Sequence, residues 1–154
     1  MCYADGDCDD DGNDSDDGVG GSCSCLCVFD VDRTLTGKQD VGGTQCPANV
    51  IMPGVYGDAY GGGDLTLSEL RQAATATFCA SCYLGVVSAG DMSGSGSAER
   101  SALLDQLPAE KRLDSGFEDG CPSPVASPLV LSCPGGYKQS TVREIVAWYE
   151  TNGI

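Results

Sequence analysis

A continuous apolar run that ends in an acid, residues 26–31, constrains the fold more than any other segment of the chain. Its sequence is LCVFDV, and every position before Asp30 is apolar. A strand without polar positions is covered on both faces, which is typical of a parallel sheet between layers of helices. The run therefore predicts a strand inside an α/β domain, with Asp30 at its carboxyl end.

Strands and helices alternate along the chain after this run, as a parallel sheet requires. Apolar segments predict two more strands, at residues 83–88 and 128–132, and amphipathic segments predict helices at residues 66–78, 98–107 and 138–151. The first helix is expected to begin at a capping box formed by Thr66 and Glu69. The glycine-rich residues 37–64 are expected to form a loop or a small flap.

The first 22 residues differ in composition from the rest of the chain. Eight of the 23 acidic residues are aspartates between Asp5 and Asp17, and the segment has almost no apolar side chain to bury. We expect a disordered acidic tail over residues 1–22 and a folded core over residues 23–154. Asp7, Asp9 and Asp11 match half of a calcium-binding loop, but Gly18 stands where its closing glutamate belongs, so a charged tail is favoured.

The charge of the chain excludes several classes of function. The net charge is −15 and there is no histidine. An acidic surface repels nucleic acid, and the lack of histidine excludes histidine-based catalysis and histidine-ligated metals. We expect no membrane partner, because no apolar run is long enough to cross a bilayer. With no secretion signal either, we expect a cytoplasmic location and mainly reduced cysteines.

Residues 28–36, VFDVDRTLT, place two aspartates at the end of the first strand. Carboxylates there are costly unless a metal or a substrate uses them; the alternative is a turn capped by Asp and Thr. Ser88 ends the second strand and Lys138 opens the last helix. In this order the segments resemble the motifs of the haloacid dehalogenase-like superfamily. The resemblance covers residues 26–154 and implies a Rossmann-like fold with a parallel sheet.

The resemblance implies a magnesium-dependent phosphohydrolase that works through an aspartyl-phosphate intermediate. Asp30 would be the nucleophile, and Asp32 would act as general acid and then as general base. Ser88, Lys138 and Thr34 would bind the phosphoryl group. Mg²⁺ would bind the Asp30 carboxylate and the Asp32 backbone carbonyl.

One motif of the superfamily has no counterpart in the chain. It is acidic and stands on the strand after the lysine helix, where this chain ends at Ile154. The fold is therefore expected to be incomplete at its C-terminus, and the chain to be a weak catalyst or none. Asp91 is the nearest substitute as a metal ligand. The missing strand would leave an open sheet edge through which two copies could associate.

Residues 38–64 are too few and too rich in glycine for a cap domain. A site without a cap is open, which favours a large or macromolecular phosphorylated substrate. Two alternatives remain. One is a binding protein or pseudoenzyme of the same fold, and the other is a cysteine-based metal or redox module. For the second, four thiolates could hold a structural zinc ion, although free thiols are favoured: Cys23, Cys25, Cys79 and Cys82.

Overall fold

The computed structural model describes residues 2–3, 25–73 and 77–154 of the chain. Its largest element is a five-stranded sheet, in which four strands run parallel and one short strand, β1, is antiparallel. In spatial order the strands of the described residues are β1 (Cys2–Tyr3), β2 (Leu26–Phe29), β5 (Tyr83–Val87), β7 (Leu129–Leu131) and β6 (Phe117–Asp119). The predicted α/β class with a parallel sheet is confirmed.

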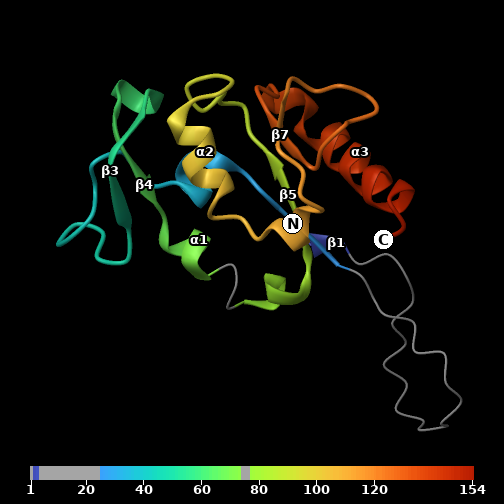
Figure 1. The fold of residues 1–154 in the computed structure, drawn as a ribbon, viewed down its shortest axis with the longest axis horizontal. Helices are drawn as coiled ribbons and strands as arrows, with labels where there is room; N and C mark the ends of the chain where they lie inside the picture. The colour runs from blue at the N-terminus through green and yellow to red at the C-terminus, as the bar shows by residue number, and fades with distance from the viewer. Residues whose placement is uncertain (1, 4–24, 74–76) are drawn as a thin grey trace, which may run out of the picture.

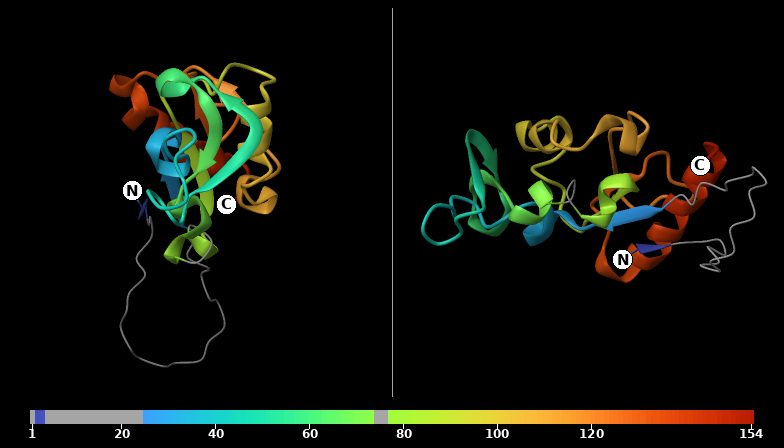
Figure 2. Two further views of the ribbon diagram at one scale, coloured as in Figure 1. Left: turned by 90° about the vertical axis from the view of Figure 1, so that its left-hand side faces the viewer. Right: turned by 90° about the horizontal axis from the view of Figure 1, so that it is seen from below.

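Two helices flank the sheet, α2 (Ala98–Leu104) on one face and α3 (Lys138–Thr151) on the other (Figure 1, Figure 2). The alternation of side chains along the strands produces this layering. Leu129 and Leu131 are fully buried in the cluster that contains Leu103 of α2. Val130 lies between them and faces the other way, into the cluster that contains Ile145 of α3.

The close approach of α3 to the sheet depends on a residue without a side chain. A Cβ atom at Gly85 would lie 3.3 Å from Ile145 Cγ2 and 3.1 Å from Val28 Cγ2, so α3 packs directly on the backbone of β5. At the far end of the helix, the buried Tyr149 hydroxyl lies 2.6 Å from the Leu84 carbonyl oxygen. These contacts fix the direction of α3, and with it the position of Lys138 at its first turn.

The helix predicted over residues 66–78 is wrong at its start. Thr66 belongs to β4 (Gly63–Leu67), and among the described residues the helix that follows, α1, covers Glu69–Ala73. Ser68 caps this helix, because its Oγ accepts a hydrogen bond from Arg71 N at 3.2 Å. The apolar residues at positions 65 and 67 follow the period of a strand, and both are buried. The pairing of Thr66 and Leu67 with a partner strand outweighs the capping signal at Thr66.

That partner is β3 (Val50–Gly57), which forms a hairpin with β4 beside the sheet (Figure 1). The hairpin corresponds to the expected small flap. Backbone hydrogen bonds join it to the chain that follows β2: Gly37 N to Thr66 O at 2.7 Å, Asp40 N to Asp64 O at 3.2 Å and, just after β4, Ser68 N to Leu35 O at 3.0 Å. Residues 108–126, for which no element was predicted, contain the edge strand β6.

The state of the cysteines differs from the prediction. Cys25 is bonded to Cys82, Cys27 to Cys79 and Cys121 to Cys133. Reduced thiols were therefore the wrong expectation for these six residues, and Cys25, Cys79 and Cys82 do not form the proposed zinc site as thiolates. The parallel pairing of β2 with β5 brings the CxC motif (Cys25 and Cys27) close to the CxxC motif (Cys79 and Cys82). Cysteines that lie this close can form disulfides instead of binding a metal ion.

Several expectations fall on residues that the structure does not describe. The acidic tail over residues 1–22 lies outside the described residues except for β1, and so do the calcium-loop aspartates and Cys23. Within the described ranges, no helix has the length and apolar composition needed to cross a membrane.

The disulfides that join β2 to the β5 side of the sheet should contribute to stability. They close segments of 57 and 52 residues, and removing such a cross-link costs about 2–5 kcal/mol in small domains. Urea unfolding should therefore shift to lower urea when dithiothreitol is present. Thiol titration of the denatured chain should find at least six fewer thiols before reduction than after it, since three disulfides hold six cysteines.

The matched control is Cys46→Ser, because Cys46 forms no disulfide within the described residues. This variant should unfold like the parent chain under both conditions. An unfolding midpoint that does not respond to the reductant would contradict the structural role of the disulfides.

Candidate active site

The candidate site lies at the carboxyl ends of the parallel strands. Phe29 of β2 pairs with Val86 of β5, and Val87 of β5 pairs with Val130 of β7. Asp30 and Ser88 therefore leave the sheet at the same edge, one from each of two neighbouring strands. Ligand sites in open parallel sheets form at this edge.

The side chains of Asp30 and Lys138 meet at this edge. Lys138 Nζ lies 2.6 Å from Asp30 Oδ2, and Asp30 Oδ1 accepts a hydrogen bond from Val31 N at 2.8 Å. The two residues are 108 positions apart in the sequence, so the contact joins the first strand of the core to the last helix. Both side chains remain partly exposed, at 40% for Asp30 and 29% for Lys138, so a ligand can reach them.

A single wide turn, Val31–Leu35, positions the two aspartates. Its ends are anchored by the fully buried side chains of Val31 and Leu35, and Thr36 closes it by donating to Val31 O from both N (3.0 Å) and Oγ1 (3.1 Å). Thr34, a predicted phosphate ligand, lies inside this turn. Its carbonyl oxygen accepts a hydrogen bond from Ser68 Oγ, which ties the turn to the start of α1.

The carboxyl group of Asp32 is half-buried beside the same edge. Burial raises its pKa above the ordinary value, and the negative charge of Asp30 raises it further, while Lys138 acts in the opposite direction. The side chain lies against the chain that leaves β5, because a Cβ atom at Gly90 would stand 2.5 Å from Asp32 Oδ2. Glycine at position 90 therefore makes room for the second aspartate.

The hydroxyl of Ser88 is fully buried and has no hydrogen-bond partner among the described residues. Both backbone groups of Ser88 are paired, since its N donates to Val130 O at 2.9 Å and its O accepts from Cys133 N at 2.8 Å. A buried hydroxyl without a partner costs about 1–3 kcal/mol. Such an atom calls for an explanation, and a ligand oxygen at this edge of the sheet would supply one.

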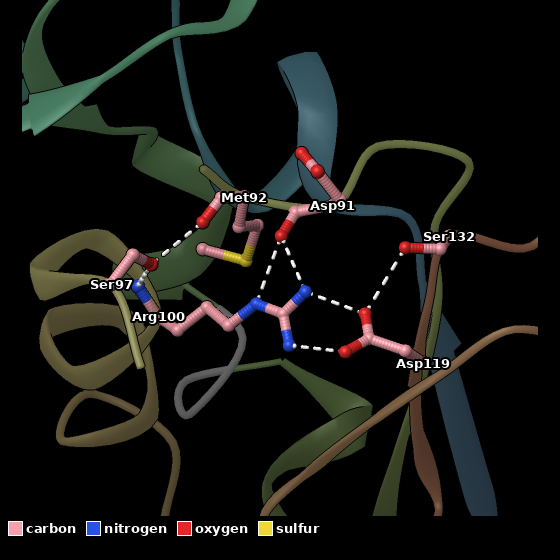
Figure 3. A network of polar contacts seen from close by, with 6 residues as sticks. All are labelled: Asp91, Met92, Ser97, Arg100, Asp119 and Ser132. Carbon is pink, nitrogen blue, oxygen red and sulfur yellow. Dashed lines mark hydrogen bonds and ion pairs between the residues drawn. The ribbon is translucent and has the colours of Figure 1, made fainter. Parts of the chain in front are cut away.

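Arg100 of α2 holds the loop that follows Ser88 (Figure 3). Its Nε and Nη2 donate to the Asp91 carbonyl oxygen at 2.9 and 2.6 Å, and its guanidinium pairs with the Asp119 carboxylate. The hydrogen bonds from Arg100 lower the pKa of Asp119. The Asp91 side chain, the expected substitute metal ligand, is exposed and points away from Arg100 in Figure 3.

A buried acid that the sequence analysis missed, Glu99, lies next to this loop. Ser93 Oγ donates to Glu99 Oε2 at 2.7 Å, and Asp58 N of the flap donates to Ser93 Oγ at 3.1 Å. Burial raises the pKa of Glu99, and the negative charges of Asp58, Asp32 and Asp91 raise it further. An acid in the first turn of a helix is ordinary in sequence, so no local signal marks Glu99 as buried.

The flap also contacts the turn Val31–Leu35 directly. The guanidinium carbon of Arg33 lies 4.1 Å from the centroid of the Tyr60 ring, at the distance of a cation–π interaction. Arg33 has a φ of 60° and follows Asp32 directly, so this contact holds the flap beside the second aspartate. The flap therefore lies beside the site through two residues of the connection after β3, Asp58 and Tyr60.

The oxygens near Asp30 provide only part of a metal site. Within the described ranges, no group of three or more acidic or cysteine side chains is arranged to hold a metal ion. The family resemblance assigns two donors, the Asp30 carboxylate and the Asp32 backbone carbonyl. Mg²⁺ commonly keeps several water ligands and is bound through one or two carboxylates plus phosphate oxygens. A single carboxylate, that of Asp30, is therefore compatible with a hydrated Mg²⁺ that also binds ligand oxygens.

Comparisons with known proteins give no relative. The chain matches no protein-family model, no curated protein and no solved structure. The choice of a function therefore rests on the residues and geometry of the site.

Glu99→Gln should make the protein more stable at neutral pH. The folded state raises the pKa of Glu99 above its ordinary value of 4.5, so folding favours the protonated form and stability falls as the pH rises through that range. Glutamine keeps the oxygen that accepts from Ser93 and removes the charge. We expect a gain of roughly 0.5–2 kcal/mol, the usual range for a stabilising substitution, measured by urea unfolding at pH 7.5.

The gain should shrink towards zero below pH 4.5, where glutamate in the unfolded chain is also protonated. Glu110→Gln provides the control, since Glu110 is exposed and its stability effect should stay small at both pH values. A Glu99→Gln variant that is less stable at pH 7.5 would show that the carboxylate charge is needed in the fold.

Proposed function

We propose that this chain is a phosphohydrolase of the haloacid dehalogenase-like kind, with a Rossmann-like core and Asp30 as the nucleophile. The observation that carries the proposal is the 2.6 Å contact between Lys138 Nζ and Asp30 Oδ2 at the carboxyl edge of a parallel sheet. Ser88 follows the neighbouring strand at the same edge, and its buried hydroxyl has no hydrogen-bond partner among the described residues. A nucleophile, a cation and a hydroxyl donor are the groups that phosphoryl transfer needs.

In the first step a carboxylate oxygen of Asp30 attacks phosphorus, and the bond between phosphorus and the leaving oxygen breaks. The protonated Asp32 carboxyl group donates its proton to that oxygen as it leaves. In the second step Asp32 removes a proton from water, the water oxygen attacks phosphorus, and the bond to Asp30 breaks. Inorganic phosphate and the original carboxylates result, with Asp32 protonated again.

The surroundings of the two aspartates support these different roles. Burial and the negative charge of Asp30 raise the pKa of Asp32, which favours the proton that a general acid must carry. Lys138 Nζ offsets the negative charge that gathers on Asp30 and on the transferring group. The Ser88 hydroxyl would donate to a phosphoryl oxygen. Mg²⁺, held by the Asp30 carboxylate and the Asp32 carbonyl, would supply further positive charge for the phosphoryl oxygens.

The substrate that we propose is a large phosphorylated molecule. The flap is a two-stranded hairpin rather than a cap domain, and it flanks the site on the side of Arg33 and Tyr60. Tyr60 and Tyr56 are exposed on it, at 58% and 60%, which leaves aromatic surface for a substrate beyond its phosphate. A binding protein without turnover is the second candidate, because the described residues offer no third acid beside Asp30 and Asp32 as a metal ligand.

The disulfides bear on where the protein would work. Disulfides persist in oxidising compartments and are rare in the cytosol. The three that join Cys25, Cys27 and Cys133 to their partners therefore favour an oxidising compartment over the cytoplasmic location expected from the sequence.

Asp30→Asn should abolish hydrolysis of p-nitrophenyl phosphate in the presence of Mg²⁺. An amide is a poor nucleophile, so we expect a loss of at least about 1,000-fold, and Lys138→Met should lose about 100- to 1,000-fold through lost charge stabilisation. Asp105→Asn is the matched control, since Asp105 is exposed at the end of α2. A rate that survives Asp30→Asn would remove Asp30 as the nucleophile.

The pH dependence should follow Asp32. Because burial raises its pKa, the protonated general acid persists above the ordinary range, and kcat/KM should fall as the pH rises through the pKa of Asp32. Asp32→Asn should lose this alkaline limb together with about 100- to 10,000-fold of the rate. The profile is measured from pH 4 to 8, and an alkaline limb that is unchanged in Asp32→Asn would assign the titration to another group.

A further inference from the structure

A cavity of about 240 Å³ lies beside the turn Val31–Leu35, and none of the four groups of the candidate site lines it: Asp30, Asp32, Ser88 and Lys138. Its wall includes Phe29, which directly precedes Asp30, and Leu35, which closes the turn. Leu84 of β5 and Leu107 after α2 complete an apolar lining. Pockets for drug-sized ligands are about 300–1,000 Å³, so this cavity suits a smaller molecule with an apolar body.

The cavity also has a cationic wall. Arg71 of α1 lines it, and the Nε atom of Arg71 is buried without a hydrogen-bond partner among the described residues. Arg71 Nη2 donates to the side-chain oxygen of Gln106, which is uncharged. Within the described ranges the only ion pairs are Arg100–Asp119 and Lys138–Asp30, so no carboxylate pairs with Arg71. Lys111 lies at the same cavity, together with Glu110.

Most basic residues of the chain lack an acidic partner within the described ranges, since of the 8 lysines and arginines only Arg100 and Lys138 form an ion pair there. What distinguishes Arg71 is its Nε, the only lysine or arginine nitrogen of the described residues that is buried without a hydrogen-bond partner. A buried guanidinium N–H without an acceptor is costly, and a carboxylate can accept from two of its N–H groups at once. The apolar lining and the buried Arg71 Nε, which has no acceptor among the described residues, together describe a site for a molecule with one apolar end and one anionic end.

We propose that this cavity binds a small organic acid, with its apolar body against Leu35, Leu84 and Leu107 and its carboxylate on Arg71. The site is separate from the phosphoryl-transfer groups, and the proposal does not depend on the proposed function. An occupant would contact Leu35, the last residue of the turn Val31–Leu35, and Phe29, which directly precedes Asp30. Its packing against these residues would stabilise the turn.

The test uses octanoate as the probe, with isothermal titration calorimetry on the full disulfide-bonded chain. Octan-1-ol has the same apolar chain without the charge, and acetate has the charge without the chain. We expect octanoate to bind at least about tenfold more tightly than either, a factor that corresponds to about 1.4 kcal/mol. Equal affinity for octanoate and octan-1-ol, or no binding of octanoate at millimolar concentration, would overturn the proposal.

Two variants locate the site. Arg71→Met keeps the apolar stem and removes the guanidinium, and it should weaken octanoate binding by at least about tenfold while leaving octan-1-ol unaffected. Ala80→Phe fills the cavity from an exposed position on its rim and should weaken both ligands. Arg143→Met, at an exposed position of α3, is the matched control and should bind octanoate like the parent chain. Unchanged octanoate binding in both Arg71→Met and Ala80→Phe would place the ligand elsewhere and refute the site.

Discussion

The parallel pairing of β2 with β5 is the constraint on which the rest of the structure depends. Its register, Leu26 opposite Tyr83 and Phe29 opposite Val86, decides which residues meet at each edge of the sheet. At the carboxyl edge it brings Asp30 and Ser88 to the same side. At the amino edge it brings the CxC segment to the CxxC segment, where two disulfides form. The chemistry of one edge and the cross-links of the other therefore follow from a single pairing.

Acidic side chains outnumber the single paired cation at the carboxyl edge of the sheet. Lys138 is the cation paired with Asp30, while Asp32, Asp58 and Glu99 gather nearby as acids. Burial of Asp32 and Glu99 raises the pKa of both, which costs stability at neutral pH. Costs of this kind often collect at functional sites, where positions are selected for chemistry rather than for stability. Because the acids there outnumber Lys138, a further positive charge at this edge, from a ligand or a metal ion, would be electrostatically favourable.

The sequence predicted the parts of the fold that rest on local patterns. The apolar runs gave the buried strands β2 and β5, and the apolar spacing after Lys138 gave α3 with its correct bounds. The helix predicted to start at Thr66 failed because residues 66 and 67 pair with β3, a partner strand that no local sequence signal indicates. Lys138 was assigned to the same site as Asp30 through the resemblance to the haloacid dehalogenase-like motifs, and the two side chains are in contact.

Other features could not be read from the sequence, since they depend on long-range packing. Glu99 looks like an ordinary acid in the first turn of a helix, and only the approach of the flap to α2 buries it. The orphan N–H of Arg71 likewise depends on how α1 meets the chain after α2. The cysteine motifs indicated proximity correctly for Cys25 and Cys82, but proximity alone does not distinguish a metal site from a disulfide.

The two disulfides at the amino edge enclose almost the same stretch of chain. Cys25–Cys82 spans 57 residues and Cys27–Cys79 spans 52, and both the turn Val31–Leu35 and the flap lie inside the enclosed segment. A protease that cuts the exposed connection of the flap would therefore leave one covalently joined molecule instead of two fragments. Asp30 would remain on one piece and Ser88 and Lys138 on the other, still held side by side by β2 and β5.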